Sequence, residues 1–354
     1  MSYADVQKAI LLVVGLYLLF QFVEAVTIIL FLFFAVFLLA MALNPVVTWL
    51  CRYRISRTLG AVLLALAVLL VVGLLGWLIV PAVVAQTQQF ILDLPGYIAA
   101  VGQRVEAWSE RFPFIRRRLV SDGQLVEQVA QLGGQLLAQA GRYTITAAGA
   151  FAALLLVLIL TIYTLARPRP LVEGLLGAVP TAYREQTRTA LVRIARQVRA
   201  WVVASLLMGA IIGTVVWIGL ALLDVPNSLL LAVLAFFGEF IPNFGPVVAA
   251  IPAVLVAFAV SPLTALWVAL LYLAIQQLDS YLLSPLIIGG SLELHPVTIA
   301  FFVLVMGALV GITGAILAVP IAAIIKILYE EFYYKPRHPD QQAIGRDADA
   351  VIAA

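Results

Sequence analysis

The sequence predicts an all-α, polytopic membrane protein. We expect about six full spans plus two broken or re-entrant helical hairpins, or eight spans, with an extramembrane helical hairpin. The 354 residues are 64% hydrophobic and 11% charged, whereas soluble domains are about 45–50% apolar and about 25% charged. Several apolar runs reach the roughly 20 residues that a helix needs to cross the hydrocarbon layer. These runs are continuous rather than alternating, which favours helices over a barrel.

Six apolar runs are predicted to be full membrane spans. They cover residues 9–23, 28–50, 59–80, 144–165, 201–223 and 262–288. A tight turn at Gln21 and Glu24 is expected to separate the first two spans, because these polar residues interrupt the apolar run. Pro81 is expected to end the third span, since proline interrupts helical hydrogen bonding.

The arginines and lysines predict the orientation, because cytoplasmic loops carry an excess of both. Basic residues follow the second span and the fourth span, and they recur in the tail; with Lys8 they are expected to be cytoplasmic. Both termini are then cytoplasmic. The expected organisation is spans 1–3 in residues 1–85, an extracytoplasmic amphipathic helical segment at 86–140, span 4 in 141–166, a basic interfacial helix at 167–200, a C-terminal transport region at 201–328 and a cytoplasmic tail at 329–354.

Two regions outside the spans have helical periodicity. In segment 86–140 apolar residues recur at steps of three and four, which predicts two amphipathic helices, the second starting near Ser121. These helices either pack on each other or form a contact between subunits. Near Pro180 a further helix is expected to begin, with an apolar stripe opposite four arginines. That pattern is typical of a helix on an anionic lipid surface and argues against nucleic-acid binding.

The apolar segments 228–260 and 296–328 differ from the six spans, because glycine and proline interrupt both in the middle. Each has 33 residues, about 50 Å as one helix, which is too long for one untilted span and too short for two. We therefore expect two helical hairpins that enter from opposite faces, although kinked full spans remain the alternative. The expected hinge positions are Pro242, Gly245, Pro246, Pro285, Gly307, Gly311, Gly314 and Pro320.

A small polar set inside these apolar surroundings supplies the candidate substrate site. Ionisable groups at membrane depth are costly and usually functional. The set consists of Glu239, Asn243, Gln276, Gln277, Asp279 and Thr313. Glu239 is the leading candidate because both topologies place it deep in the membrane, whereas Asp279 could equally lie at a solvated helix end. Asn243 and Thr313 are expected at the two hairpin tips, meeting near the bilayer midplane.

The sequence offers no sign of an enzyme. It has no phosphate-binding loop and no His/Cys cluster with metal-ligand spacing, so we expect no cofactor and no metal. A readable Ser/His/Asp arrangement is also missing.

The C-terminal phrases resemble those of a known family. They are residues 240–246 and 251–253, then Gln276-Gln277-Leu278-Asp279, Ser284-Pro285 and Leu294-His295-Pro296, and the Gly307, Gly311, Gly314 run that ends in Ala318-Val319-Pro320. This ordered set resembles the autoinducer-2 exporter (AI-2E) family; Asp279 stands where the family often has glutamate. The resemblance implies a multi-pass permease of the bacterial inner membrane that assembles as a homo-oligomer, with a pentamer as the candidate.

Three functions stay open at this stage. The first is secondary transport of a small polar solute, with autoinducer-2 as the named candidate. The second is exchange of a monovalent cation, sodium or lithium, for a proton. The third is a non-transporting membrane scaffold that acts through segment 86–140.

Overall fold

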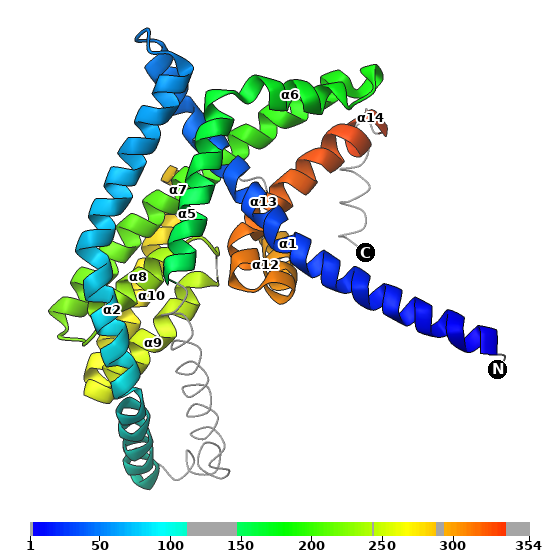
Figure 1. The fold of residues 1–354 in the computed structure, drawn as a ribbon. Helices are drawn as coiled ribbons and strands as arrows, with labels where there is room; N and C mark the ends of the chain where they lie inside the picture. Colours follow the sequence, from blue (N-terminus) through cyan, green and yellow to red (C-terminus); the bar gives the residue numbers. More distant parts are fainter. Residues whose placement is uncertain (1–2, 112–146, 243, 288–293, 338–354) are drawn as a thin grey trace, which may run out of the picture. The chain divides into compact units, whose positions relative to one another are not determined.

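The computed structural model describes residues 3–111, 147–242, 244–287 and 294–337 (Figure 1). Within these residues every regular element is a helix and no strand occurs, which confirms the all-α class. The chain divides into two compact units, residues 1–67 with 148–175 and residues 68–147 with 176–354. Each unit is considered by itself.

The first unit contains α1 (Tyr3–Cys51), the beginning of α2 (Arg57–Arg111), α5 (Ala147–Ala166) and α6 (Pro168–Gly177). Ala40, Val47, Ala61 and Leu165 form its buried core. Arg57, at the start of α2, forms hydrogen bonds with residues near the ends of α1 and α5. Its Nε donates to the carbonyl oxygen of Leu165 at 2.9 Å, and its Nη2 donates to the side-chain oxygen of Asn44.

The expected turn between the first two spans is wrong. α1 is one helix of 49 residues that continues through Gln21 and Glu24. The reason is that two polar side chains without glycine or proline do not end a helix. A continuous helix crosses a bilayer once, so the count of crossings before the basic loop falls by one. The cytoplasmic placement of the N-terminus depended on two crossings before the basic loop. With one crossing fewer, the position of that loop no longer supports it, and it remains a prediction.

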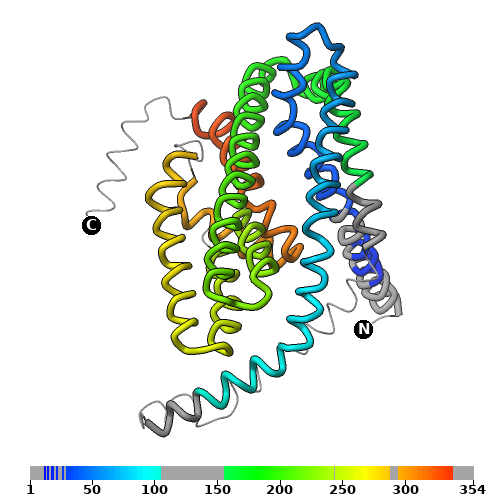
Figure 2. Tube along the Cα trace, turned by 90° about the vertical axis from the view of Figure 1, so that its left-hand side faces the viewer, coloured from blue at the N-terminus to red at the C-terminus, as the bar shows by residue number. Residues whose placement is uncertain are grey.

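The expected end of the third span at Pro81 is also wrong. α2 has 55 residues and contains both Pro81 and Pro95, so segment 86–140 begins as a continuation of the span. Its first part, to Arg111, is helical as predicted, and the second predicted helix lies outside the described residues. Figure 2 shows the cyan part of α2 turning away from the line of its earlier turns, as proline within a helix allows.

The predicted basic helix begins after Pro180, as expected, with η2 (Thr181–Tyr183) and α7 (Arg184–Leu222). Ile194, Val198 and Trp201 of its apolar stripe are buried, and the four arginines opposite are exposed. However, α7 continues without a break into the next span, and Figure 2 shows it as one long green column. The arginine-bearing turns therefore belong to the same helix as the span, and their placement on the lipid surface stays a prediction.

The second unit continues with a series of shorter helices. These are α8 (Ser228–Gly238), α9 (Gly245–Val260), α10 (Pro262–Leu278), the π-helical turn η3 (Asp279–Leu283) and α11 (Ser284–Ile287), then α12 (Pro296–Val310), α13 (Ile312–Tyr329), the π-helical turn η4 (Glu330–Tyr334) and α14 (Lys335–Arg337). Ser261 fixes the α9–α10 corner, because its Oγ accepts a hydrogen bond from the Thr264 amide at 2.9 Å while Pro262 begins α10. Buried side chains of α7, α8, α9 and α10 form the main core.

Among the described residues, five helices are long and apolar enough to cross a membrane. They are Ile29–Cys51, Arg57–Arg104, Thr181–Leu222, Pro262–Ile287 and Ile312–Arg337. The bent pair α5–α6 adds a sixth if it counts as one span. α8, α9 and α12 have 11, 16 and 15 residues, about 16–24 Å of helix. Each is shorter than the ~30 Å hydrocarbon core, so these three helices fit hairpin legs better than full spans, whereas α13 lies in a segment long enough to cross.

Candidate functional site

Hairpin 1 consists of α8 and α9, joined by the break at residues 239–244. Leu231 and Ala235 of α8 belong to the same buried cluster as Ala249 and Ala253 of α9, as antiparallel packing around a central tip requires. Gly245 makes the tip possible. A Cβ on Gly245 would overlap the carbonyl group of Gly238, so the two helix ends approach backbone to backbone.

Hairpin 1 also packs against α7 at a glycine pair. A Cβ on Gly209 would lie 2.8 Å from the Phe236 carbonyl oxygen, and one on Gly213 would lie 3.2 Å from the Phe236 Cβ. Small residues four apart let membrane helices approach this closely. The glycine pair therefore determines which face of α7 packs against α8.

Hairpin 2 consists of α12 and α13, which lie side by side (Figure 1). Gly311 forms its tip with φ 70° and ψ −151°, a conformation that is essentially limited to glycine. Its amide donates to the Gly307 carbonyl at 2.9 Å, and a Cβ on Gly314 would overlap the Met306 carbonyl. Three of the expected hinge glycines therefore build this tip. Pro320 does not, because it is buried inside the continuous helix α13.

The two hairpins contact each other. Ile241 and Phe244, in the break of hairpin 1, pack against a buried cluster of Val303, Ala315 and Ala318 in hairpin 2. Asn243, between those two residues, lies outside the described residues. The break of hairpin 1 thus meets the two legs of hairpin 2 close to its tip.

Glu239 is the buried acidic group at the break of hairpin 1. It directly follows α8, its side chain is 7% exposed, and among the described residues its Oε1 has no hydrogen-bond partner. Phe240, the next residue, packs edge-on against the Trp201 ring of α7 at 6.1 Å between ring centroids. An unsatisfied buried carboxylate oxygen is costly, so Glu239 stays the leading candidate for the site.

Asp279 is the second acidic group of the site. It begins the π-helical turn η3 at the end of α10, a distortion that is frequent at functional sites. The Glu239 and Asp279 carboxyl groups lie close enough to interact electrostatically. Asp279 Oδ1 is also buried without a hydrogen-bond partner in the described part of the chain. Two predicted site residues therefore lie within electrostatic range of each other.

The remaining predicted residues have different surroundings. Gln276 is half-buried on α10, three residues before Asp279, whereas Gln277 is exposed because it lies on a different face of the helix. Thr313 is exposed just after the tip of hairpin 2. Pro246 lies in the first turn of α9, and Pro285 lies in α11 after the π-helical turn.

Two polar groups near this region were missed in the sequence. The Tyr272 hydroxyl and the Trp201 indole nitrogen are buried, and neither has a hydrogen-bond partner in the described residues. Tyr272, Gln276 and Asp279 follow one another at steps of four and three, the spacing of one helix face. That spacing is the signal that could have identified Tyr272.

Helix α2 contacts the base of hairpin 1, which is the end of the hairpin opposite its tip. The side-chain oxygen of Gln86 accepts a hydrogen bond from the Leu230 amide, near the start of α8, at 2.9 Å. Arg104 donates to the carbonyl oxygens of Phe258 and Val260, at the end of α9, at 3.0 Å each. Phe90 and Tyr97 pack against the core between these points. One helix thus supplies the missing partners at both ends of the hairpin.

An ion-pair cluster holds the base of hairpin 2. Arg193 of α7 pairs with Glu330 at 2.8 Å and with Glu331 at 2.5 Å. Glu331 also pairs with Lys335 at 2.5 Å, and its side chain is 7% exposed. Since Arg193 lies at the end of α7 opposite to its connection with α8, the two hairpins are held at opposite ends of α7.

Residues 9–334 match the family model described as AI-2E family transporter. The chain belongs to the AI-2E transporter family. The Bacillus subtilis protein YueF, whose name presents it as a candidate transport protein, is 30% identical over 296 residues, covering 81% of this chain and 79% of YueF. The AI-2 transport protein TqsA of Escherichia coli K12 is 27% identical over 297 residues, 83% of each chain.

Proposed function

We propose that the protein is a secondary transporter of the bacterial inner membrane that moves a small polar solute. The observation that supports this most directly is the pair of acidic residues in apolar surroundings, Glu239 at the break of hairpin 1 and Asp279 at the π-helical turn after α10. Membership of a transporter family adds to it. The pair accepts hydrogen bonds from hydroxyl groups, and the Tyr272 hydroxyl and Trp201 indole supply donors.

We propose autoinducer-2, a small neutral polyhydroxylated molecule, as the first solute to examine. One relative, TqsA, is named as an AI-2 transport protein. The proposed site comprises Glu239, Asp279 and Gln276, with Asn243 and Thr313 from the hairpin tips. Homo-oligomeric assembly belongs to this proposal.

Access to the site would alternate by movement of the hairpins. Broken helices are tolerated at membrane depth where they line a cavity, and they mark transporter sites. α2 holds the base of hairpin 1, and Arg193 holds the base of hairpin 2 at the other end of α7. Under the charge argument the first contact faces outside and the second faces the cytoplasm. Release of one contact at a time would open one side at a time.

A second candidate function is exchange of sodium or lithium for a proton. The electrostatic interaction between the two carboxyl groups favours it, because binding one cation or one proton lowers the cost of holding two like charges in an apolar region. Transport in proteoliposomes and everted vesicles separates the two functions. Solute uptake without sodium- or lithium-triggered proton movement supports the first, and proton movement without any solute effect supports the second.

A further inference from the structure

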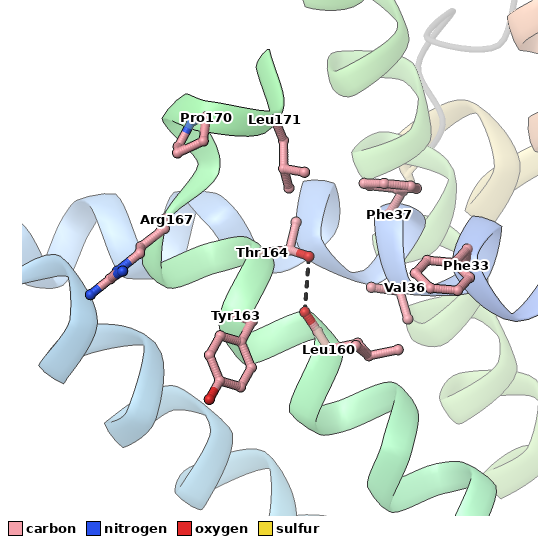
Figure 3. A pocket seen from close by; sticks show the side chains of 9 residues that line it. All are labelled: Phe33, Val36, Phe37, Leu160, Tyr163, Thr164, Arg167, Pro170 and Leu171. Atoms are coloured by element: carbon pink, nitrogen blue, oxygen red, sulfur yellow. Dashed lines mark hydrogen bonds between the residues drawn. The ribbon is translucent and has the colours of Figure 1, made fainter. Parts of the chain in front are cut away.

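An apolar hollow lies in the first unit, between α1 and α5 and beside α6 (Figure 3). Its volume is about 350 Å³. Six of its lining side chains are Phe33, Val36 and Phe37 of α1, Leu160 and Tyr163 of α5, and Leu171 of α6. Thr164 also lines it, but its hydroxyl donates to the Leu160 carbonyl at 2.9 Å, so it needs no external partner. This interior suits a hydrocarbon chain and not a polar solute.

The bend between α5 and α6 fixes the depth of the hollow in the membrane. The two helix axes differ by 77° at Arg167. If α5 crosses the bilayer, α6 lies close to the membrane plane, with apolar Leu171 and Leu175 and the polar pair Arg169–Glu173. Such a short amphipathic helix belongs at the boundary between headgroups and acyl chains. The hollow beside it is therefore at acyl-chain depth.

Arg167 stands at the corner and also lines the hollow. It is exposed, and among the described residues it makes no ion pair, whereas its neighbour Arg169 pairs with Glu173 at 2.6 Å. Figure 3 shows its guanidinium group extending away from the Phe33 and Phe37 rings. A positive charge at headgroup depth, next to an apolar hollow, matches a phosphate with an attached acyl chain.

We propose that this hollow binds a phospholipid, with one acyl chain between Phe37 and Leu160 and the phosphate on Arg167. The arginine fork offers two parallel N–H donors to phosphate oxygens. The aromatic rings of α1 supply the apolar contact for the chain. This site is separate from the Glu239–Asp279 site, and its test does not depend on transport.

Native mass spectrometry of the full-length protein, titrated with phosphatidylglycerol after delipidation, tests the proposal. Arg167→Gln is compared with Arg169→Gln, which removes a neighbouring arginine that already has a partner. We expect Arg167→Gln to lower phosphatidylglycerol retention about tenfold or more, Phe37→Ala to lower it as well, and Arg169→Gln to leave it near wild type. Inorganic phosphate should not compete, because it has no acyl chain.

Three results would overturn the proposal. The first is equal retention by wild type and Arg167→Gln, and the second is equal loss in Arg167→Gln and Arg169→Gln. The third is displacement of the bound lipid by inorganic phosphate. A change in oligomer size in Phe37→Ala, without a change in lipid retention, would instead assign the hollow to a second copy of the chain.

Discussion

Replacing Arg104 with glutamine removes the contacts that hold the end of α9 to α2. Arg104 donates two hydrogen bonds of 3.0 Å, to the Phe258 and Val260 carbonyl oxygens. Both acceptors belong to the last turn of α9, where carbonyl groups have no partner within the helix. The positive charge also interacts favourably with the C-terminal end of the helix dipole.

The size of the effect follows from these contacts. A hydrogen bond with a charged partner contributes about 1.5–3 kcal/mol, and a cation at a helix C-terminus about 0.3–1 kcal/mol when exposed. Arg104 is half-buried, so we take about 2 kcal/mol for the whole contact. That free energy corresponds to about a 30-fold change in the equilibrium for opening the base of hairpin 1.

Hydrogen–deuterium exchange of the protein in nanodiscs measures this opening. Peptides that cover the last two turns of α9 should lose about 30-fold in protection in Arg104→Gln, and peptides from α13 should not change. Arg196→Gln is the control, because Arg196 is exposed on α7. Unchanged protection of α9 in Arg104→Gln, or equal loss in Arg196→Gln, would refute the argument that α2 holds the hairpin.

Three further predictions concern packing, ion pairing and orientation. Gly245→Ala should sharply lower the yield of folded protein, whereas Gly102→Ala, with no atom within 4 Å of the added Cβ, should not; size-exclusion chromatography compares them, and similar yields would contradict the tight tip. Arg193→Gln should destabilise the protein by on the order of 2 kcal/mol, less than a fully buried pair because Arg193 is 30% exposed. In thermal unfolding, Arg193→Gln should cost less in a Glu331→Gln background than in wild type, because one of its partners is already gone; an equal cost in both backgrounds would disprove the pairing. A cysteine at Gln103, with Cys51 removed, should react with an impermeant reagent only from outside; labelling only from the cytoplasm would reverse the orientation.

Local signals in the sequence predicted the two hairpins. Gly245 and Gly311 interrupt long apolar segments, and only glycine allows the close approach or the backbone conformation that those tips require. Glu239 was selected as the leading site candidate because a carboxyl group between apolar helices is unusual. These features depend on neighbouring residues, so they can be read from one sequence.

Other features could not be predicted in this way. Pro81 and Pro95 lie inside α2, although the low helix propensity of proline predicts a helix end at each. Prolines are tolerated within membrane helices where neighbouring groups satisfy the freed backbone atoms. The contact of Arg104 with α9 joins residues 154 positions apart, and the contact of Arg193 with Glu331 joins residues 138 apart. Such pairs depend on tertiary packing, which no local pattern encodes.

Solute flux through purified protein tests the central proposal most directly. Proteoliposomes containing wild type, Glu239→Gln or the exposed control Glu185→Gln would be assayed with autoinducer-2, other small polyols, and sodium or lithium with a proton-sensitive dye. We expect wild type and Glu185→Gln to transport the same substrate, and Glu239→Gln to be at least about tenfold slower at equal folded yield, as loss of a charged hydrogen bond implies. Wild-type flux equal to that of protein-free liposomes for every substrate, or full flux in Glu239→Gln, would contradict the account.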